Sequence, residues 1–494
     1  MHLGIDLGTS GVKAVLTGPA GEVLAQATAP LALSSPRPLW SEQDPEDWLR
    51  ATQAALASLR ASRDLSGVRA LGLAGQMHGA VLLDASDQVL RPAILWNDGR
   101  SGAECAALEQ AQPASRGITG NLAMPGFTAP KLLWVRRHEP EIFARTRRVL
   151  LPKDWLRLRL TGEAVSEMSD ASGTLWLDVA ARRWSGAMLE ATGLSEAQMP
   201  ALVEGTAPAG RLRAEMAALL GLPAGIPLAG GAGDNAAGAV GIGCVSPGDA
   251  FLSLGTSGVV FVSDPGFLPD PARTVHAFCH CLPGTWHRMS VILSAAAALS
   301  WVTRVTGAGS EAALLAEVEQ AGLAKPGRLA FLPYLSGERT PHNDPRAAGV
   351  FFGLSGTDER ADLARAVLEG VAFALADGLE ALEALGGRIE ALTAIGGGAR
   401  STAWLRILSA ATARPIRSVI GGEAGPALGA ARLARIAAGD GSIAEVCTKP
   451  PVAVQYEPEA GLAAALAPRR AAYRRLYPTL QTLFAETVDP EPLA

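Results

Sequence analysis

The sequence predicts an α/β fold made of two similar halves. Short apolar runs typical of strands alternate with longer amphipathic patterns typical of helices, which favours sheets covered by helices. One motif also occurs twice, half a chain apart: residues 5–12 read Ile-Asp-Leu-Gly-Thr-Ser-Gly-Val, and residues 252–259 read Leu-Ser-Leu-Gly-Thr-Ser-Gly-Val. The two copies indicate an ancient duplication with one hairpin in each half; a chance match is the alternative, because few residues agree.

The expected elements follow this pattern along the chain. Each copy of the motif predicts two strands joined by a turn, with further strands and helices between and after them. Residues 245–250 precede the second copy and are the best candidate boundary, so we expect domains at 1–245 and 246–494. The strand-like runs are 2–7, 12–16, 69–74, 80–84, 226–230, 250–254, 258–262 and 391–395, and the helical patterns are 46–62, 130–138, 289–304, 363–386 and 401–413.

Composition argues against several classes of protein. Of 494 residues, 48% are hydrophobic and 18% charged, which supports sizeable cores and shows no sign of disorder. The net charge is −5 and the arginines are scattered along the chain. The sequence therefore gives no sign of the clustered basic surface that binding to nucleic acid or an anionic membrane requires. Five scattered cysteines do not resemble a disulfide framework, and Asp6 interrupts the first apolar run, unlike a signal peptide. We expect a cytoplasmic protein without a nucleic-acid or membrane partner.

Both Gly-Thr-Ser-Gly turns have the composition of an anion-binding loop. Glycine accepts positive φ angles, which exposes consecutive backbone N–H groups, and the hydroxyl side chains add donors. An ordinary hairpin turn is the alternative for each copy alone, but the repetition and the acid before the first copy favour phosphate binding. The candidate residues are Gly8, Thr9 and Ser10 in the first turn and Gly255, Thr256 and Ser257 in the second.

A third glycine-rich turn lies at 391–400, which reads Ala-Leu-Thr-Ala-Ile-Gly-Gly-Gly-Ala-Arg. An apolar strand ends in three glycines and a helix starts near Ser401, so a flat ring could lie against bare backbone with a helix N-terminus nearby for a phosphate. The candidate residues are Gly396, Gly397, Gly398 and Ala399. The chain has neither a P-loop motif nor a Gly-x-Gly-x-x-Gly opening a first βαβ unit.

Two acids and one lysine complete the set that phosphoryl transfer needs. Asp234 is an isolated charge in an apolar, glycine-rich stretch, which indicates a general base; a helix N-cap is the alternative. Asp6 lies beside the first turn, where it could meet a Mg²⁺ ion that bridges phosphates, with Asp234 as a second metal candidate. Lys13 falls on the returning strand, within reach of the transferring phosphate, or else faces solvent.

A cluster of His and Cys lies at 276–281, with His276, Cys279, His280 and Cys281. Zinc sites usually pair such a knuckle with a second one at a distance, and none appears nearby. In a strand, Cys279 and Cys281 would share one face while His280 points the other way. We interpret the segment as a buried strand, with a metal site as the alternative.

Five segments together resemble the FGGY family of carbohydrate kinases, within the actin-like ATPases. Asp6 to Ser10 and Leu254 to Gly258 resemble two phosphate loops, and Ile395 to Ala399 resembles an adenosine loop. The first family signature resembles residues 126–138. The second resembles residues 349–354 together with 363–369. The resemblance implies ATP and Mg²⁺ as cofactors, often a homodimer, and two ribonuclease-H-like, actin-type domains facing a central cleft. It places the sugar mainly on residues 1–245, which carry the first phosphate loop, and ATP mainly on 246–494.

Further segments resemble the family members that phosphorylate the 5-hydroxyl of D-xylulose: 39–44, 75–79, 94–100, 120–126 and 334–342. In those kinases the residues matching Met77 and His78 contact the sugar, and the one matching Asp234 is the catalytic base. A sugar pocket needs fixed polar groups that go unpaired with the wrong isomer. The neighbouring candidates are Gln76, Asn97, Asp98 and Arg100, and Trp96 or Trp40 could stack on a sugar face or belong to the core.

Two alternatives remain at this point. The first is a kinase of the same family acting on ribulose, gluconate, glycerol or a rarer ketose; residues 75–79, Gly-Gln-Met-His-Gly, argue against it. The second is a non-catalytic, actin-like nucleotide-binding protein. Such a protein would keep the three ATP loops but would need neither a lone base at Asp234 nor a sugar loop at His78.

Overall fold

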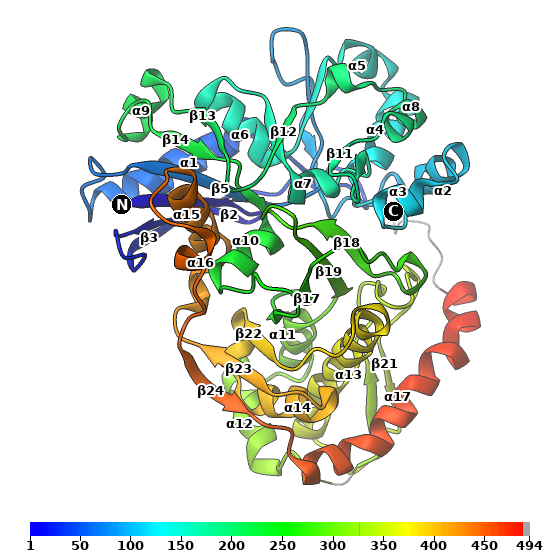
Figure 1. The fold of residues 1–494 in the computed structure, drawn as a ribbon. Coiled ribbons are helices and arrows are strands. Elements are labelled where there is room, and N and C mark those ends of the chain that lie inside the picture. Colours follow the sequence, from blue (N-terminus) through cyan, green and yellow to red (C-terminus); the bar gives the residue numbers. More distant parts are fainter. Residues whose placement is uncertain (326, 488–494) are drawn as a thin grey trace.

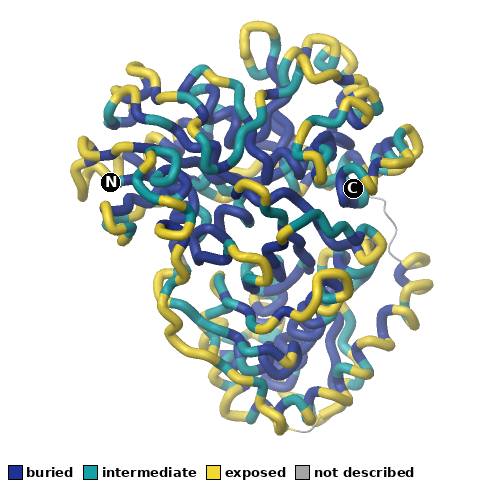
Figure 2. The backbone as a smooth tube through the Cα atoms, viewed as in Figure 1, coloured by how far each residue is buried: buried dark blue, intermediate teal, exposed yellow. Residues whose placement is uncertain are grey.

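Two sheet-centred halves make up the fold, one above the other in Figure 1. The computed structural model describes residues 1–325 and 327–487. Each half contains a seven-stranded sheet with helices packed against it, which confirms the predicted α/β class. Figure 2 shows buried segments running through the middle of each half and exposed segments on its outer loops.

The N-terminal sheet consists of β1 (His2–Leu7), β2 (Gly11–Thr17), β3 (Val23–Pro30), β5 (Ala70–Gly75), β13 (Pro208–Arg211), β14 (Pro227–Ala229) and β15 (Ala232–Gly233). Its order is β13-β14-β5-β1-β2-β3, with β15 beside β5. β1 is antiparallel to β2 and parallel to β5. The first motif therefore forms a hairpin next to a parallel strand, and its turn lies where the central strand β1 ends.

The C-terminal sheet consists of β16 (Ala250–Leu254), β17 (Gly258–Asp264), β18 (His276–Cys279), β19 (Trp286–Ile292), β22 (Leu392–Ile395), β23 (Ile416–Val419) and β24 (Val452–Tyr456). Its order is β18-β19-β17-β16-β22-β23-β24. β16 is antiparallel to β17 and parallel to β22, as β1 is to β2 and β5. This shared arrangement supports the predicted duplication.

Helices and short strand pairs surround the two sheets. The longest helix besides the C-terminal one is α13 (Arg360–Gly386), whose apolar residues are buried through most of its length. The other helices are α1 (Pro45–Arg60), α2 (Gly102–Ala111), α3 (Ser115–Thr119), α4 (Thr128–His138), α5 (Pro140–Arg145), α6 (Pro152–Thr161), α7 (Met168–Ser172), α8 (Gly186–Thr192), α9 (Ala214–Leu220), α10 (Asp234–Gly241), α11 (Ala296–Val305), α12 (Glu311–Ala321), α14 (Thr402–Thr412), α15 (Gly425–Ala437), α16 (Ile443–Val446) and α17 (Ala460–Thr487). The short strands are β4 (Glu42–Gln43), β6 (Val81–Leu83), β7 (Ala93–Ile94), β8 (Arg148–Leu150), β9 (Val165–Glu167), β10 (Leu177–Asp178), β11 (Arg183–Trp184), β12 (Ala201–Val203), β20 (Ala330–Leu332) and β21 (Val350–Phe352). In the described part of the chain, no helix is both long and apolar enough to span a membrane.

Helix α15 crosses back from the C-terminal half and packs on the N-terminal sheet. A Cβ at Gly4 of β1 would lie 1.9 Å from the carbonyl oxygen of Ala427, and one at Gly72 of β5 would lie 1.9 Å from that of Ala430. Only glycine permits such a close approach of helix to sheet. The strands of the two sheets lie on either side of residue 245 in the sequence. Helix α15 follows the second sheet in the chain but packs against the first. The domain boundary at residue 245 stays a prediction.

The stretch 289–304, predicted as one helix, is a strand followed by a helix. Its first residues belong to β19, which pairs with both β17 and β18, and α11 begins only at Ala296. An unbroken apolar run does not distinguish a buried strand from a buried helix by its periodicity, which is why the prediction was wrong.

Residues 276–279 form the fully buried strand β18. The interpretation of this segment as a strand is therefore confirmed for these four residues. All five cysteines of the chain are free. Among the described residues, no group of three or more His, Cys, Asp or Glu side chains is arranged to hold a metal ion.

Candidate active site

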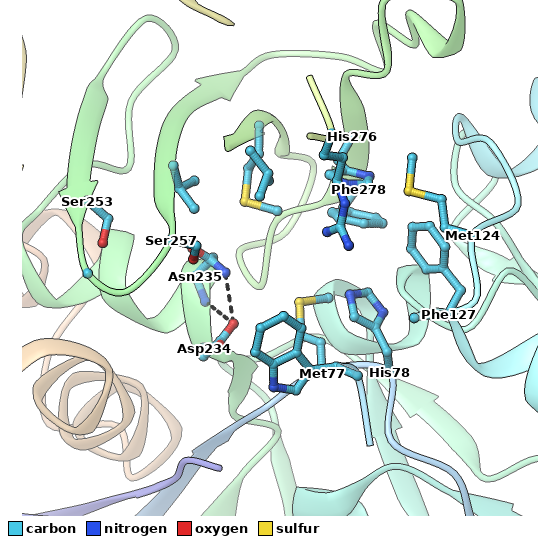
Figure 3. Close-up of a pocket in the computed structure, with 17 residues that line it drawn as sticks. Met77, His78, Met124, Phe127, Asp234, Asn235, Ser253, Ser257, His276 and Phe278 are labelled. Carbon is cyan, nitrogen blue, oxygen red and sulfur yellow. Dashed lines mark hydrogen bonds between the residues drawn. The ribbon is translucent and has the colours of Figure 1, made fainter. Parts of the chain in front are cut away.

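A cavity of about 250 Å³ lies between the two halves (Figure 3). It is smaller than the roughly 300–1,000 Å³ of pockets for drug-sized ligands, so it suits a small polar molecule. The N-terminal half contributes Met77, His78, Trp96, Met124, Gly126, Phe127, Asp234 and Asn235, and the C-terminal half contributes Ser253, Gly255, Ser257, Val259, His276, Phe278, Met289, Val291 and Arg339.

Asp234 lies at the cavity, where β15 passes into α10 (Figure 3). Gly233 is the N-cap of that helix and Asp234 its first residue, so the alternative interpretation as an N-cap is wrong. Its Oδ1 accepts hydrogen bonds from the backbone N and the Nδ2 of Asn235, at 2.7 and 2.9 Å. Burial raises the pKa of Asp234 to about 6, against the effect of these bonds. A carboxylate with a pKa near neutrality is well suited to accept a proton.

Asp6 lies on β1, two strands away from Asp234 in the same sheet. It pairs with Lys13 of β2 on one side and Ala74 of β5 on the other, and Ala74 pairs with Ala232, just before Asp234. Burial and the negative charge of Asp234 raise the pKa of Asp6 to about 7, while Lys13 opposes the rise. The Oδ1 atom of Asp6 is buried and has no hydrogen-bond partner among the described residues. Asp6 and Asp234 therefore lie close enough to interact electrostatically, and a cation bound between or beside them would be favoured.

His78 presents a defined hydrogen-bond acceptor to the cavity. Its Nδ1 lies 2.7 Å from the carbonyl oxygen of Gly173. Because a carbonyl only accepts, Nδ1 carries the proton, and Nε2 is left as the acceptor. Burial lowers the pKa of His78 to about 3, so the ring is neutral at physiological pH. A neutral imidazole with one free lone pair can orient a sugar hydroxyl by accepting its hydrogen.

Helix α4 holds the backbone of His78, which has a positive φ of 67°. The carbonyl oxygen of His78 accepts hydrogen bonds from Thr128 Oγ1 at 3.1 Å and Lys131 Nζ at 2.9 Å. Lys131 also donates to the carbonyl oxygen of Gly126 at 2.6 Å, and burial lowers its pKa to about 7. One of the few lysines of the chain thus ties together two loops that line the cavity.

The short helix α7 links His78 to Asp234 from behind. Its Ser169 Oγ accepts a hydrogen bond from the backbone N of Gly233 at 3.0 Å, immediately before Asp234. The carboxylate of Glu167 caps the helix by accepting bonds from Ser169. The carbonyl oxygen after the helix, on Gly173, is the one that orients His78. The buried helix α7 therefore helps to position both His78 and Asp234.

The first Gly-Thr-Ser turn joins β1 to β2, but the hydroxyl of Thr9 is already occupied. It donates to Gln76 Oε1 at 3.1 Å and accepts from Trp96 Nε1 at 2.9 Å. Gly8 N donates back across the turn to Gly11 O at 3.0 Å. The side chain that remains available for a phosphate is Ser10, which is exposed. The predicted donor role of the Thr9 hydroxyl is corrected accordingly.

The second and third glycine turns follow two adjacent parallel strands, β16 and β22. Gly255 and Ser257 line the cavity, and the start of α11 holds their turn through a bond from Ala296 N to Gly255 O at 2.8 Å. Gly396 has a φ of 89°, and a Cβ there would lie 2.8 Å from the carbonyl oxygen of Leu254. The two turns are therefore packed together, as loops that bind one nucleotide must be.

The comparisons with known proteins agree with this arrangement. Residues 1–241 match the N-terminal domain of the FGGY family of carbohydrate kinases, and residues 250–438 match its C-terminal domain. The chain belongs to the FGGY family of carbohydrate kinases. It is therefore an ATP-dependent sugar kinase, and the non-catalytic alternative is set aside.

Two relatives with high identity to this FGGY kinase are named for the same activity. A xylulose kinase from Escherichia coli (strain K12) is 56% identical over 487 residues, which cover 98% of this chain and 100% of that protein. A crystal structure of a "xyloylose kinase" from Brucella ovis matches with a TM-score of 0.93 at 54% identity, over 98% of this chain and 99% of that one. A gluconate kinase from Lactobacillus acidophilus matches with a TM-score of 0.90 at 24% identity, over 98% and 99% of the two chains, which shows the fold alone.

Four of the predicted sugar ligands do not line the cavity of this FGGY kinase. Asp98 and Arg100 form a buried ion pair at 2.7 Å, and the Arg100 guanidinium lies 3.5 Å from the ring centre of Trp40. Asn97 accepts a bond from a serine hydroxyl at 2.7 Å, and Gln76 donates to a neighbouring glutamine at 3.2 Å. All four side chains are thus engaged with residues 40–43, so they stabilise the wall behind the cavity. Of the two candidate tryptophans, only Trp96 lines it.

Several residues that line the cavity are not among the ligands predicted from the sequence. Ser253 occupies the position in the second motif that Asp6 occupies in the first, so the repeat could have indicated it. Met124, Gly126, Phe127 and Arg339 lie inside segments that carried the FGGY resemblance, but without an assigned role. The remaining ones are Asn235, Val259, His276, Phe278, Met289 and Val291, most of which are brought to the cavity by the pairing of β17, β18 and β19.

Proposed function

We propose that this chain transfers the γ-phosphate of ATP to the 5-hydroxyl of D-xylulose, giving D-xylulose 5-phosphate. The observation that carries the proposal is the position of Asp234 in one cavity with the sugar loop at Met77 and His78 and the phosphate turn at Gly255 and Ser257. The near full-length similarity to xylulose kinases supports the choice of substrate.

In this reaction Asp234 accepts the proton of the terminal hydroxyl as that oxygen bonds to the γ-phosphorus. The bond between the γ-phosphorus and the oxygen bridging to the β-phosphorus breaks, and ADP leaves. His78 accepts a hydrogen bond from another hydroxyl and so orients the sugar. Met77 and Phe127 provide apolar walls that exclude water, which would otherwise compete as acceptor. Lys13 stabilises negative charge near Asp6.

Asp6 is the residue that fits the implied Mg²⁺ ion. Its buried, unpaired Oδ1 and the proximity of Asp234 create a place where a cation is favoured. Mg²⁺ is usually held by one or two carboxylates together with phosphate oxygens and water, so a site of two acids is sufficient. When bound, the ion would neutralise charge on the phosphates. We propose Asp6 as its main protein ligand and Asp234 as the second candidate.

The substrate assignment is tested by ADP release from Mg-ATP with a panel of acceptors: D-xylulose, D-ribulose, L-ribulose, gluconate, glycerol and no sugar. We expect a strong response to D-xylulose and little with the others. A stronger response to another acceptor would keep the kinase mechanism but reject D-xylulose. Silence with every acceptor would reject the proposed reaction.

We expect kcat/KM for the sugar to fall about tenfold per pH unit below about pH 6. Burial raises the pKa of Asp234 to about 6, and only the deprotonated carboxylate can accept a proton, so activity is present above this pH and lost below it. The measurement is the pH profile from 5 to 8 at saturating Mg-ATP. A profile that stays level down to pH 5 would contradict the assignment of Asp234 as the base.

Two further predictions accompany the proposed function. The free cysteines are compatible with a reducing compartment such as the cytoplasm. The homodimer expected from the family resemblance stays a prediction, for which the molar mass in solution is the measurement.

A further inference from the structure

Arg339 brings an unpaired positive charge to the cavity. Its side chain lines the cavity. Its guanidinium makes no hydrogen bond, and no ion pair within 4.0 Å, with the described residues. The neighbouring Glu338 acts on this charge only from beyond ion-pair distance. Holding a guanidinium in a partly buried cavity without a direct partner is unfavourable, so the group is best explained by a ligand that supplies acceptors.

The residues on both sides of Arg339 are anchored to β19 and the residue that follows it. Thr340 N donates to Val291 O at 3.0 Å, and Val291 N donates to Thr340 Oγ1 at 3.0 Å. On the other side, Glu338 Oε1 accepts a bond from Leu293 N at 3.1 Å. The chain that carries Arg339 is thus fixed before any ligand binds, which favours a preorganised donor.

The two imidazoles at this cavity both present acceptors. His276 Nδ1 lies 2.9 Å from Asn121 Oδ1, and the amide nitrogen of Asn121 is engaged with two carbonyls, so Oδ1 accepts and Nδ1 donates. As in His78, Nε2 is left as the acceptor. Burial lowers the pKa of both rings, and the charge of Arg339 adds to this effect. Both rings are therefore neutral, with one free lone pair each.

Acceptors alone cannot recognise a ketose. A hydroxyl can donate its hydrogen to an imidazole, but a ketone oxygen only accepts and would be repelled by a second lone pair. Arg339 is the charged donor among the described residues that line the cavity. Arg339 precedes Thr340, which bonds to Val291 of β19, and its charge lowers the pKa of His78 and His276. His276 lies apart from Asp234 across the cavity in Figure 3, so we place the guanidinium toward the end of the cavity away from the base.

We propose that Arg339 donates hydrogen bonds to the C2 ketone oxygen of the sugar and thereby makes the enzyme prefer a ketose to the corresponding polyol. This role rests on the proposed reaction, in which Asp234 accepts the proton of the hydroxyl at the other end of the sugar. Since Arg339 belongs to the C-terminal half and His78 to the N-terminal half, a bound ketose is contacted from both sides of the cleft.

The test compares D-xylulose with xylitol and D-arabinitol, the two polyols formed by reducing its ketone. We measure kcat and KM for all three with the full chain and with Arg339→Met, Arg339→Gln and Arg339→Lys. We expect Arg339→Met to lower kcat/KM for D-xylulose about 100-fold, because a site built to hydrogen-bond a substrate group discriminates strongly. The polyols should lose less than about tenfold, so the preference for the ketose falls at least tenfold. Arg339→Lys, which keeps a charged donor, should recover part of it.

Arg346→Met is the matched control, because Arg346 follows in the same loop and is about half exposed. It should leave all three kcat/KM values unchanged. If Arg339→Met does not fold, as judged by circular dichroism, the same ratio is read from Arg339→Gln. A ketose-to-polyol ratio that is unchanged in the folded variants would overturn the proposal.

A failure of the proposed substrate is distinguishable from a failure of this role. If the wild-type enzyme prefers another ketose, D-xylulose is wrong, and the ratio for that ketose and its own reduced forms tests Arg339 in the same way. If the wild-type enzyme prefers an acceptor without a ketone, the role of Arg339 is overturned as well.

Discussion

Replacing Asp234 by Asn is expected to lower kcat by about 10²- to 10⁴-fold, the range by which a general base accelerates a reaction. The side chain keeps its size and can still accept the bonds from Asn235, but it cannot take a proton. Sugar binding should be largely retained, because Met77, His78 and the wall of the cavity are unchanged. The effect should therefore appear in kcat while KM for D-xylulose changes little.

The measurement is steady-state ADP release at saturating Mg-ATP and sugar. Asp64→Asn is a suitable control, since Asp64 is an exposed acid whose hydrogen bonds, within the described part of the chain, go to Ser66. It should show wild-type turnover. If Asp234→Asn retained more than a tenth of the wild-type kcat, another group would have to be the base.

Replacing Lys153 by Met is expected to destabilise the protein by about 3–5 kcal/mol, the cost of breaking a buried ion pair from one side. Lys153 Nζ lies 2.7 Å from Asp154, 3.0 Å from Asp170 and 3.6 Å from Glu167, and all four side chains are 0% exposed. Burial opposes the charge on Lys153, but the three carboxylates outweigh it and raise its pKa. Without the lysine, Arg157 would be the remaining cation at this cluster.

The loss is measured from the shift in the urea midpoint and the wild-type slope. Lys325→Met is the control: Lys325 is half exposed and pairs with Asp362, so its loss should cost less than about 1 kcal/mol. Burial raises the pKa of Asp170 against the pull of Lys153, which makes this acid the one that best tolerates neutralisation. Adding Asp170→Asn to Lys153→Met should therefore recover part of the stability. An unchanged midpoint for Lys153→Met would show that the buried charges do not need the lysine.

Residues whose position depends on one strand and its turn were predictable from local patterns. Asp6 lies near the end of a short apolar strand, and Asp234 and the turn at Gly255 follow such strands. The end of the strand and the glycines beside it largely determine where these residues lie. The prediction of sugar ligands failed where a second structural element determines the direction of the side chain. Asp98 and Arg100 pair with each other, and Arg100 packs on Trp40, so their side chains are engaged there and do not line the cavity.

The amino-acid sequence alone was enough to predict the two α/β halves, the glycine turns and the position of Asp234 at the end of a strand, because each depends on contacts between residues close in the chain. The cavity itself depends on contacts over long distances in the chain. Arg339 and His276 meet His78 only because β18 and β19 pair and the two halves face each other. The burial that raises the pKa values of Asp6 and Asp234 also arises only in the folded chain. Desolvation and side-chain direction are properties of the packed molecule, and no local pattern encodes them.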